Sequence, residues 1–484
     1  MSYTSWQYYV MVIVLIIAYY LIPRKFRWLS LLAGSIFFYT QVIFSRKQII
    51  VFLCSIIVSY VAGLILQKLR DADRPKLKKA VLFFGILLST FPLLLEKLGD
   101  FLYGSLLRVP RVSWIIPVGL SFYTLQLVSY QIDIYRGRIN AQINPLKYAL
   151  FASFFPQIIQ GPIPRYEQLN KELFEGNSYN YENIKKGAQL VLWGFFLKYM
   201  IADKSAVFVN KVFDNYQTYT GVYVIVAAIL YSFQLYTDFL SCTTMSQGVS
   251  QMFGIHLIDN FNHPYFSTSI KEFWRRWHMS LSSWLRDYIY IPLGGNRRGT
   301  ICKWINLLIT FTVSGFWHGG SWKFLFWGLL HAFYQIIGEV KDKIAAKKKF
   351  CFSVIRSRRV SLVLQRICTF VLVMIGWIVF RAESLRVSFV MFKNIMILNP
   401  WILFDDSIFN LGLNWKEFFV LVLSLLILYY VSRKQEQGLV VRDWIARQHI
   451  IVRWGIYLVA IWVIWICGSY GFGFDAKDFI YGGF

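Results

Sequence analysis

The sequence predicts an all-α integral membrane protein, and three observations support this prediction. Hydrophobic residues make up 57% of the 484-residue chain, whereas charged residues make up only 16%. Apolar runs recur along the chain at roughly twenty residues, the length that a helix needs to cross a hydrocarbon core of about 30 Å. Lys and Arg lie mainly in the short connections between these runs, as is typical of polytopic membrane proteins.

About twelve segments are long or apolar enough to be predicted spans. Because neither a soluble domain nor an internal repeat is evident, residues 1–484 are expected to form a single polytopic domain. The first span lacks a preceding basic region and a following small-residue cleavage pattern, so we expect it to be retained. The predicted spans are Trp6–Ile22, Trp28–Phe44, Gln48–Leu66, Ala80–Leu95, Ser113–Tyr135, Gly187–Met200, Val222–Leu240, Trp304–Ser314, Trp322–Ile337, Ser361–Phe380, Trp415–Val431 and Trp454–Gly468.

The distribution of basic residues predicts the orientation of these spans. Connections rich in Lys and Arg alternate with poorer ones, and the positive-inside rule places the rich connections in the cytoplasm and both termini outside. The net charge of +26 resides in these connections, and no soluble basic domain is present to bind nucleic acid. The expected location is therefore the cytoplasmic membrane. The rich connections are 24–27, 68–79, 341–359 and 433–453, and the poorer ones are 96–111, 203–220 and 381–414.

Two stretches fit neither a span nor a simple loop. Phe151–Arg165 is apolar, but its three prolines forbid a continuous helix. Lys271–Trp322 combines His, Arg, Asp, Trp and Gly at membrane-adjacent positions, where ionisable groups suggest function. Since lipid cannot satisfy a broken backbone, we expect both stretches to be re-entrant or in-plane segments over a central cavity. Three tryptophans of the second stretch are interpreted as interfacial anchors, namely Trp274, Trp277 and Trp284.

The second stretch carries two histidines with the chemistry of proton transfer. His318 precedes Gly319 and Gly320, so a neutral imidazole could accept a hydroxyl proton while glycine N–H groups face an oxyanion. A structural His at a helix end is an equally open interpretation. His278 could orient a substrate or assist His318, or it could be an interfacial His. His331 lies inside a span, where a cavity-lining role and a hydrogen-bonded core role both remain open.

Basic residues surround His278 on the predicted cytoplasmic side. Guanidinium groups bind phosphates bidentately, so this set suits a phosphorylated cytosolic donor. The positive-inside signal and lipid headgroup binding are the alternatives. Asp287 is expected to pair with Arg286. No metal site or cofactor is expected, because the cysteines are scattered and no His-x-x-x-His pair exists. The predicted donor-binding residues are Arg275, Arg276, Arg286, Arg297 and Arg298.

Several of these segments together resemble the membrane-bound O-acyltransferase (MBOAT) family, in its bacterial branch of alginate and peptidoglycan O-acetyltransferases. The resemblance implies a ring of about 11–12 helices with re-entrant or in-plane segments around a central tunnel. It implies that His318 is the essential His and His278 the second His motif. We expect Trp274, Trp317, Gly319 and His331 to line the tunnel. The matching segments are Pro117–Tyr123, Asp133–Gly137, Phe154–Pro156, Gly161–Ile163, Tyr236–Phe239, Phe273–Asp287, Ile291–Gly295 and Trp317–Gly319.

The resemblance also implies an activity. Acetyl from cytosolic acetyl-CoA would cross the membrane for O-acetylation of a cell-surface polysaccharide or peptidoglycan, and a separate extracytoplasmic SGNH-type partner would complete the transfer. Tyr481, in the aromatic C-terminal motif Asp478–Phe484, would carry the acyl group transiently, or it would serve as an interfacial anchor. The alternatives are a D-alanyl (teichoic acid) or other acyl exporter that uses an acyl carrier protein, and a non-catalytic transporter. Membrane lipid is the remaining expected partner.

Overall fold

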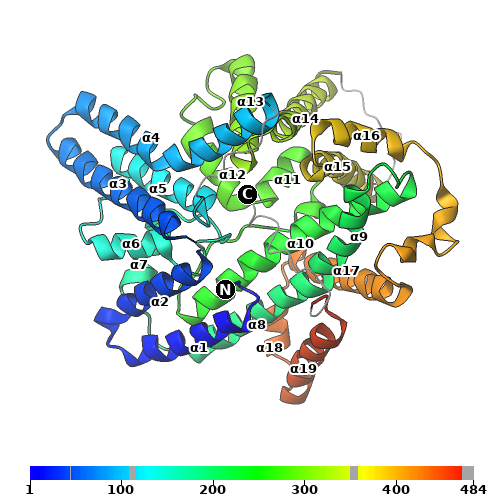
Figure 1. The fold of residues 1–484 in the computed structure, drawn as a ribbon, viewed down its shortest axis with the longest axis horizontal. Helices are drawn as coiled ribbons and strands as arrows, with labels where there is room; N and C mark the ends of the chain where they lie inside the picture. The colour runs from blue at the N-terminus through cyan, green and yellow to red at the C-terminus, as the bar shows by residue number, and fades with distance from the viewer. Residues whose placement is uncertain (44, 108–115, 349–357, 471–484) are drawn as a thin grey trace. The chain divides into compact units, whose positions relative to one another are not determined.

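The computed structural model describes residues 1–43, 45–107, 116–348 and 358–470, and helices α1 to α19 dominate them (Figure 1). Within these ranges the chain contains no β-strand. Two compact units divide the chain. Of the described residues, 1–194 and 242–259 belong to one unit, and 195–241 and 260–470 belong to the other. The helical fold class is confirmed, while the single domain, the ring and the tunnel stay predictions.

Each of the twelve predicted spans overlaps a helix in the described residues. Six helices are long and apolar enough to cross a membrane, and α1 is a shorter apolar helix. The chain is therefore a multi-pass membrane protein, as predicted. The helices at the predicted spans are α1 (Trp6–Leu21), α2 (Arg27–Val42), α3 (Arg46–Asp71), α4 (Pro75–Gly99), α5 (Leu120–Tyr135), α8 (Tyr181–Phe195), α10 (Val222–Met252), α13 (Gly299–His318), α14 (Trp322–Lys348), α15 (Arg358–Arg381), α17 (Trp415–Glu436) and α19 (Ile450–Cys467).

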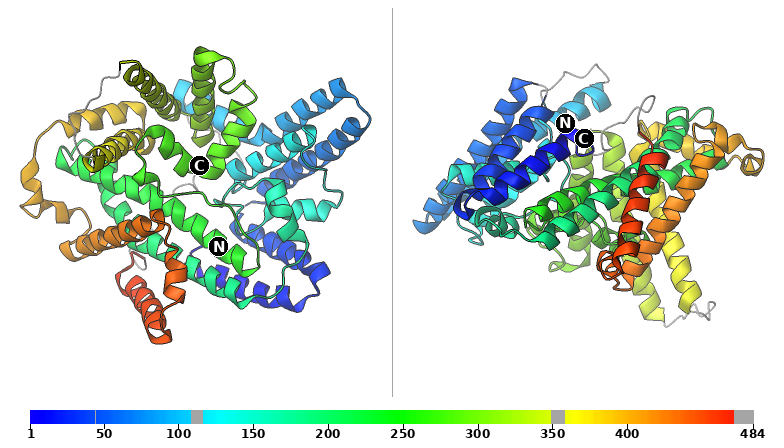
Figure 2. Two further views of the ribbon diagram at one scale, coloured as in Figure 1. Left: turned by 180° about the vertical axis from the view of Figure 1, so that it is seen from behind. Right: turned by 90° about the horizontal axis from the view of Figure 1, so that it is seen from below.

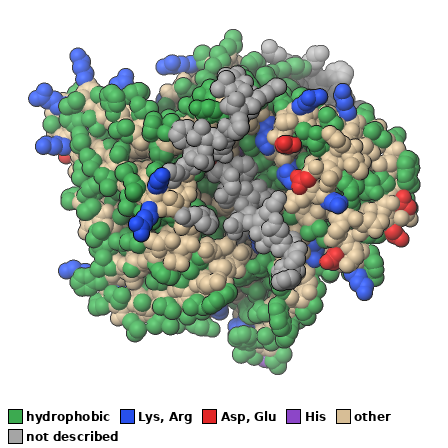
Figure 3. Space-filling model, viewed as in Figure 1, with side chains coloured by type: hydrophobic (Ala, Val, Ile, Leu, Met, Phe, Trp, Pro, Cys, Tyr) green, Lys and Arg blue, Asp and Glu red, His purple; other side chains and the backbone are tan. Residues whose placement is uncertain are grey.

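The outer faces of these helices carry the apolar side chains that lipid requires. In α19, Ile451 is 74% exposed and Trp465 is 63% exposed. On its inner side, α19 contacts the π-helix Phe196–Ala202, and α17 contacts the same π-helix (Figure 2). Hydrophobic side chains also predominate over charged ones on the face drawn in Figure 3. A surface this apolar would be a liability in water, which agrees with a membrane location.

Several helix ends differ from the prediction. Helix α13 begins at Gly299 and ends at His318, whereas the predicted span covers only Trp304–Ser314. Helix α10 continues from the predicted end at Leu240 to Met252. The apolar pattern stops where polar residues begin, but a helix can continue through polar turns when they are buried in protein. In α10 these turns carry buried small polar side chains, among them Ser241 and Ser246.

In the proline-containing stretch Phe151–Arg165 the helix ends at Ser153, and the residues that follow are irregular and largely buried in protein, as predicted. Side chains of its own unit satisfy the backbone groups that a helix would have paired. The Phe155 carbonyl accepts a hydrogen bond from the Tyr3 hydroxyl at 2.9 Å, and the Phe155 N–H donates to Ser35 Oγ at 3.2 Å. Gln126 Nε2 donates to the Phe151 carbonyl at 2.8 Å. These bonds replace the hydrogen bonds to water that a membrane environment would not supply. The other short helices of this unit are α6 (Pro145–Ser153) and α7 (Tyr166–Phe174).

The second unit contains a buried ionic group. Lys198 Nζ lies 2.9 Å from Asp203 Oδ1 and 2.7 Å from Asp238 Oδ1, and all three side chains are less than a tenth exposed. The ammonium joins the π-helix, the start of α9 (Asp203–Asp214) and α10. Buried charges persist only when they are paired and hydrogen-bonded, so this group fixes the three segments to one another.

We predict that Lys198→Met destabilises the protein by about 3–5 kcal/mol, because it leaves two buried carboxylates without a cation. Thermal unfolding in detergent, followed by fluorescence or aggregation, measures the effect. The control is Lys185→Met, which breaks the more exposed pair of Lys185 with Glu182 at 2.5 Å. Such pairs contribute about 1 kcal/mol or less. Equal losses for the two variants would contradict the structural role of Lys198.

Helices α13 and α14 approach each other closely at two glycines. A Cβ on Gly315 would overlap the carbonyl oxygen of Phe324, and a Cβ on Gly328 would overlap that of Phe311. Small residues allow such backbone contact between membrane helices. This contact sets the position of His318, because the histidine lies one turn beyond Gly315 at the end of α13.

We predict that Gly328→Ala lowers stability by about 1–3 kcal/mol, since a backbone carbonyl cannot move aside as a flexible side chain can. Gly338→Ala on the same helix is the matched control, because no atom of the described residues lies within 4 Å of a Cβ there. Alanine favours helix over glycine by about 1 kcal/mol, so the control keeps or raises the unfolding temperature. A Gly328→Ala variant as stable as Gly338→Ala would refute the close contact.

Candidate functional site

His278 occupies a strained position between two short helices of the second unit. Helix α11 (Ile270–Arg276) ends just before it, and it caps the N-terminus of α12 (Met279–Leu285). Its backbone is left-handed, with φ 43° and ψ 55°, and the residue is 1% exposed. A non-glycine residue in this region costs roughly 1–2 kcal/mol, and such strain is concentrated at functional sites. Burial lowers the pKa of His278 to about 3, so the imidazole is neutral at physiological pH.

Hydrogen bonds on both sides hold His278 in this conformation. The Asn262 N–H donates to the Arg276 carbonyl at 2.9 Å, and the Met279 N–H donates to the Asn260 carbonyl at 2.8 Å. The Ser280 N–H also donates to Asn260 Oδ1 at 3.3 Å. Residues 260–262 therefore run beside 276–280 and clamp the backbone around the histidine.

Trp317 joins His278 to His318. The His278 ring centroid lies 6.1 Å from that of Trp317, and the Trp317 and His318 centroids lie 4.8 Å apart. Phe239 of α10 covers the other side of His278 edge-on at 4.7 Å. The structure thus brings the two predicted catalytic histidines into one aromatic cluster of the second unit.

A second indole continues the cluster from His318 to His331. Trp327 lies 5.1 Å from His318 and 5.1 Å from His331, measured between ring centroids. Phe380 contacts His318 edge-on at 5.3 Å, and Trp377 stacks on Trp327 at 5.9 Å. Aromatic rings on several sides restrict the rotation of the imidazole. We call this set the histidine–aromatic cluster: His278, His318, His331, Trp274, Trp317, Trp327, Trp377 and Phe380.

His318 is 3% exposed and is the last residue of α13. Glycine is required next to it because the Phe324 ring occupies the space where a Cβ of Gly319 would lie. The Gly319 N–H donates to the Gly315 carbonyl at 3.2 Å. It therefore continues the helix, and the interpretation of this N–H as an oxyanion donor is wrong in this conformation. The helix needs that bond because its last turn is buried.

His331 is fully buried and receives a hydrogen bond from an indole. Trp274 Nε1 donates to His331 Nδ1 at 3.3 Å, so the neutral imidazole carries its hydrogen on Nε2. A Cβ on Gly376 of α15 would lie 2.7 Å from His331 Nε2 and 3.6 Å from Trp327 Nε1. Within the described ranges neither of these two buried donors has a hydrogen-bond partner. The arrangement offers N–H groups to a water molecule or to a carbonyl oxygen.

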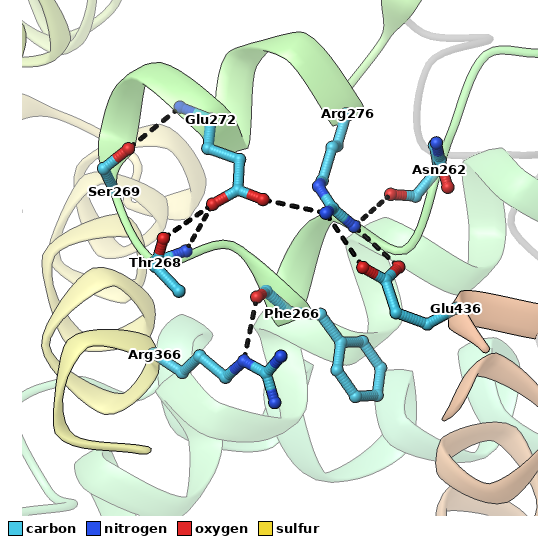
Figure 4. A network of polar contacts seen from close by, with 8 residues as sticks. All are labelled: Asn262, Phe266, Thr268, Ser269, Glu272, Arg276, Arg366 and Glu436. Atoms are coloured by element: carbon cyan, nitrogen blue, oxygen red, sulfur yellow. Dashed lines mark hydrogen bonds and ion pairs between the residues drawn. The ribbon is translucent and has the colours of Figure 1, made fainter. Parts of the chain in front are cut away.

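The predicted donor-binding arginines differ in their surroundings. Arg275, Arg297 and Arg298 are exposed. Arg286 is exposed and pairs with Asp287 at 2.8 Å, which confirms the predicted salt bridge. Both terminal nitrogens of Arg276 already contact carboxylates (Figure 4). The role of the set in donor binding stays a prediction.

Nearby, the basic surface also contains an ion-paired glutamate. Lys303 lies 2.5 Å from Glu339, and Lys343 lies 2.8 Å from the same carboxylate. Their hydrogen bonds lower the pKa of Glu339 to about 2. The charge of these two lysines is thus neutralised in part.

The interpretation of the tryptophans as interfacial anchors is wrong for two of them. Trp277 is 1% exposed and Trp284 is 6% exposed, so both lie in the protein interior. Trp277 stacks on Phe273 at 5.4 Å and contacts Phe261 at 5.0 Å. Local sequence cannot separate an interfacial indole from a buried one, because both occur at the ends of apolar stretches.

Sequence reasoning missed several members of the site. Asn260, Trp327, Trp377, Gly376 and Phe380 carry no local chemical signal, and only their contacts reveal them. Tyr481 lies outside the described residues. Among the residues that are described, no three His, Cys, Asp or Glu side chains come together as metal ligands.

We predict that Trp274→Phe lowers stability by about 1–3 kcal/mol, because it keeps an aromatic ring but leaves the buried His331 Nδ1 without its donor. Trp304→Phe is the control. Trp304 Nε1 donates to Glu339 Oε2 at 3.3 Å, a carboxylate that also binds two lysines. Thermal unfolding of the two variants provides the comparison. If both variants unfold at the same temperature, the Trp274–His331 bond contributes nothing.

Comparison with known proteins places these residues in a family. The sequence model of the MBOAT, membrane-bound O-acyltransferase family, matches residues 137–381, a range that holds the whole histidine–aromatic cluster. The probable alginate O-acetylase of Pseudomonas aeruginosa is 37% identical over 322 residues, which cover 66% of this chain and 59% of that protein. The peptidoglycan O-acetyltransferase of Helicobacter pylori is 33% identical over 402 residues, 77% of this chain and 74% of that protein.

A third relative is named for a different activity. The teichoic acid D-alanyltransferase of Bacillus subtilis is 30% identical over 335 residues, which cover 64% of this chain and 80% of that protein. The match to the alginate relative spans about three fifths of that protein's length. Since the family model covers half of this sequence and the Helicobacter relative is matched over 74% of its own length, this chain belongs to the membrane-bound O-acyltransferase family.

Proposed function

We propose that this chain is an O-acetyltransferase that moves acetyl from cytosolic acetyl-CoA across the membrane to a cell-envelope glycan. The carrying observation is the buried His318, held edge-on between Trp317 and Trp327 at the end of α13. Two relatives are named for O-acetylation of alginate and of peptidoglycan. Their names favour acetyl as the transferred group and a glycan as the acceptor.

The proposed chemistry needs one proton acceptor. The acceptor hydroxyl attacks the thioester carbonyl while His318 takes the hydroxyl proton. The new ester C–O bond forms, the C–S bond breaks, and the proton passes from His318 to the leaving thiolate of CoA. A positioned base of this kind contributes about 10²–10⁴-fold to the rate. The aromatic walls keep the imidazole oriented and exclude water that would hydrolyse the thioester.

Other residues have supporting roles in this proposal. Neutral His278, held in its left-handed conformation, orients a reacting group through the same cluster. The exposed arginines 275, 286, 297 and 298 attract the phosphates of CoA. Tyr481 serves as a transient acyl carrier. An extracytoplasmic SGNH-type partner then completes the transfer to sugar.

We predict that His318→Ala lowers envelope O-acetylation at least about 100-fold, because it removes the base. The measurement is acetate released by mild alkali from envelopes of cells that express each variant at equal levels. His256→Ala is the control, since His256 is exposed and pairs with Glu172 in the other unit. Unchanged acetylation in the His318→Ala cells would refute the proposal.

A reconstituted system distinguishes the alternative donor. The similarity to a teichoic acid D-alanyltransferase keeps acyl export from a carrier protein as a second candidate. Proteoliposomes that contain the purified chain are supplied with [¹⁴C]acetyl-CoA or with D-[¹⁴C]alanyl carrier protein. Consumption of the acetyl-CoA label supports the proposal, whereas consumption of the carrier label alone supports the alternative.

A further inference from the structure

Arg276 is the centre of a charged network that joins four segments of the second unit (Figure 4). Its Nη1 lies 2.7 Å from Glu436 Oε2, and its Nη2 lies 2.9 Å from Glu436 Oε1, which is a bidentate pair. Nη2 also lies 2.8 Å from Glu272 Oε1. Glu436 is the last residue of α17, 160 positions along the chain from Arg276. It lies beyond the range that the family model matches.

The partners of Arg276 are themselves held in place. Glu272 Oε2 accepts from both the N–H and the hydroxyl of Thr268 at 2.8 Å, and the Glu272 N–H donates to Ser269 Oγ at 3.2 Å. Burial raises the pKa of Glu272, but the bonds from Thr268 and the charge of Arg276 outweigh it and lower the pKa overall. The hydrogen bonds with Glu436 raise the pKa of Arg276. The network therefore stays charged at physiological pH.

The network ends two residues before His278. The Arg276 carbonyl accepts from the Asn262 N–H at 2.9 Å, and Arg276 Nη1 approaches the Asn262 carbonyl at 3.4 Å. On the other side of His278, Asn260 accepts from the Met279 and Ser280 N–H groups. The left-handed His278 thus lies in a short segment whose two ends are bonded to residues 260–262. Arg276 ties the first of these ends to α17.

We propose that Glu436 is a positioning residue for His278, acting through the guanidinium of Arg276, an inference that rests on the proposed acyl transfer. The bidentate pair fixes the end of α11, and the end of α11 sets where the His278 backbone turns into its left-handed conformation. Arg276 therefore does not bind the donor in this proposal, because a phosphate would have to displace a carboxylate from each of its terminal nitrogens. A displacement of a reacting group by about 1 Å can lower the rate about 100-fold.

The test compares Glu436→Gln, Arg276→Gln and the double variant in proteoliposomes of the full chain with acetyl-CoA. Both single variants should lower kcat about 10- to 100-fold and leave the KM for acetyl-CoA within about twofold. The double variant should be no worse than the worse single, since both act through one contact. The matched control is Glu339→Gln, which breaks an ion pair of comparable exposure that does not touch residues 260–280. Its kcat should stay unchanged.

A different pattern would overturn the proposal. If Arg276→Gln raises the KM for acetyl-CoA and Glu436→Gln changes nothing, Arg276 binds the donor and Glu436 positions nothing. Where Glu436→Gln is poorly recovered, Glu436→Asp replaces it, because the shorter carboxylate keeps the charge but cannot keep both contacts to Arg276.

A second measurement separates this proposal from the proposed function. Amide hydrogen exchange of the peptide 260–282 needs no substrate, and Glu436→Gln should raise exchange at the Asn262 and Met279 amides at least about tenfold. Unchanged exchange would overturn the positioning role even if the wild type turns over acetyl-CoA. Raised exchange in a protein that does not turn over acetyl-CoA would sink the acyl-transfer proposal and leave the network as a support of the fold.

Discussion

Lipid offers no hydrogen-bonding partner to a backbone that leaves the helix, and this constraint governs both broken segments of the chain. In the first unit, the side chains of Tyr3, Ser35 and Gln126 pair with backbone groups of Phe151 and Phe155. In the second unit, residues 260–262 supply the partners of 276–280. Each break is thus tolerated because the fold brings another segment to it, and the second break places His278 in a conformation that a regular helix forbids.

In the candidate site, imidazole rings are packed against indole and phenyl rings. His278, His318 and His331 each contact at least one tryptophan ring, and each imidazole is buried. A low-dielectric environment disfavours the charged form of histidine and strengthens the interactions of the neutral form. A neutral imidazole that is held in one orientation suits proton transfer better than one that is solvated and free to rotate.

Some charged side chains in the second unit hold segments of the chain together, and others are exposed and suited to attract ligands. Lys198 joins a π-helix to α9 and α10, and Arg276 joins α11 to α17. The guanidinium of Arg276 is held by two carboxylates, whereas Arg275 and Arg297 are exposed. Chemical identity alone does not distinguish these two uses of arginine, because the positive-inside pattern places both on the same side.

The sequence by itself determined the membrane class, the approximate positions of the long apolar helices, the two broken segments and the histidines in the candidate site. It could do so because apolar length, proline and ionisable residues act locally on the chain. Only the tertiary structure decided that Trp277 and Trp284 are interior residues, that the Gly319 N–H belongs to its helix, and that Arg276 pairs with a glutamate 160 positions away. Burial and pairing depend on which distant segments meet, and that is a property of packing that no local pattern records.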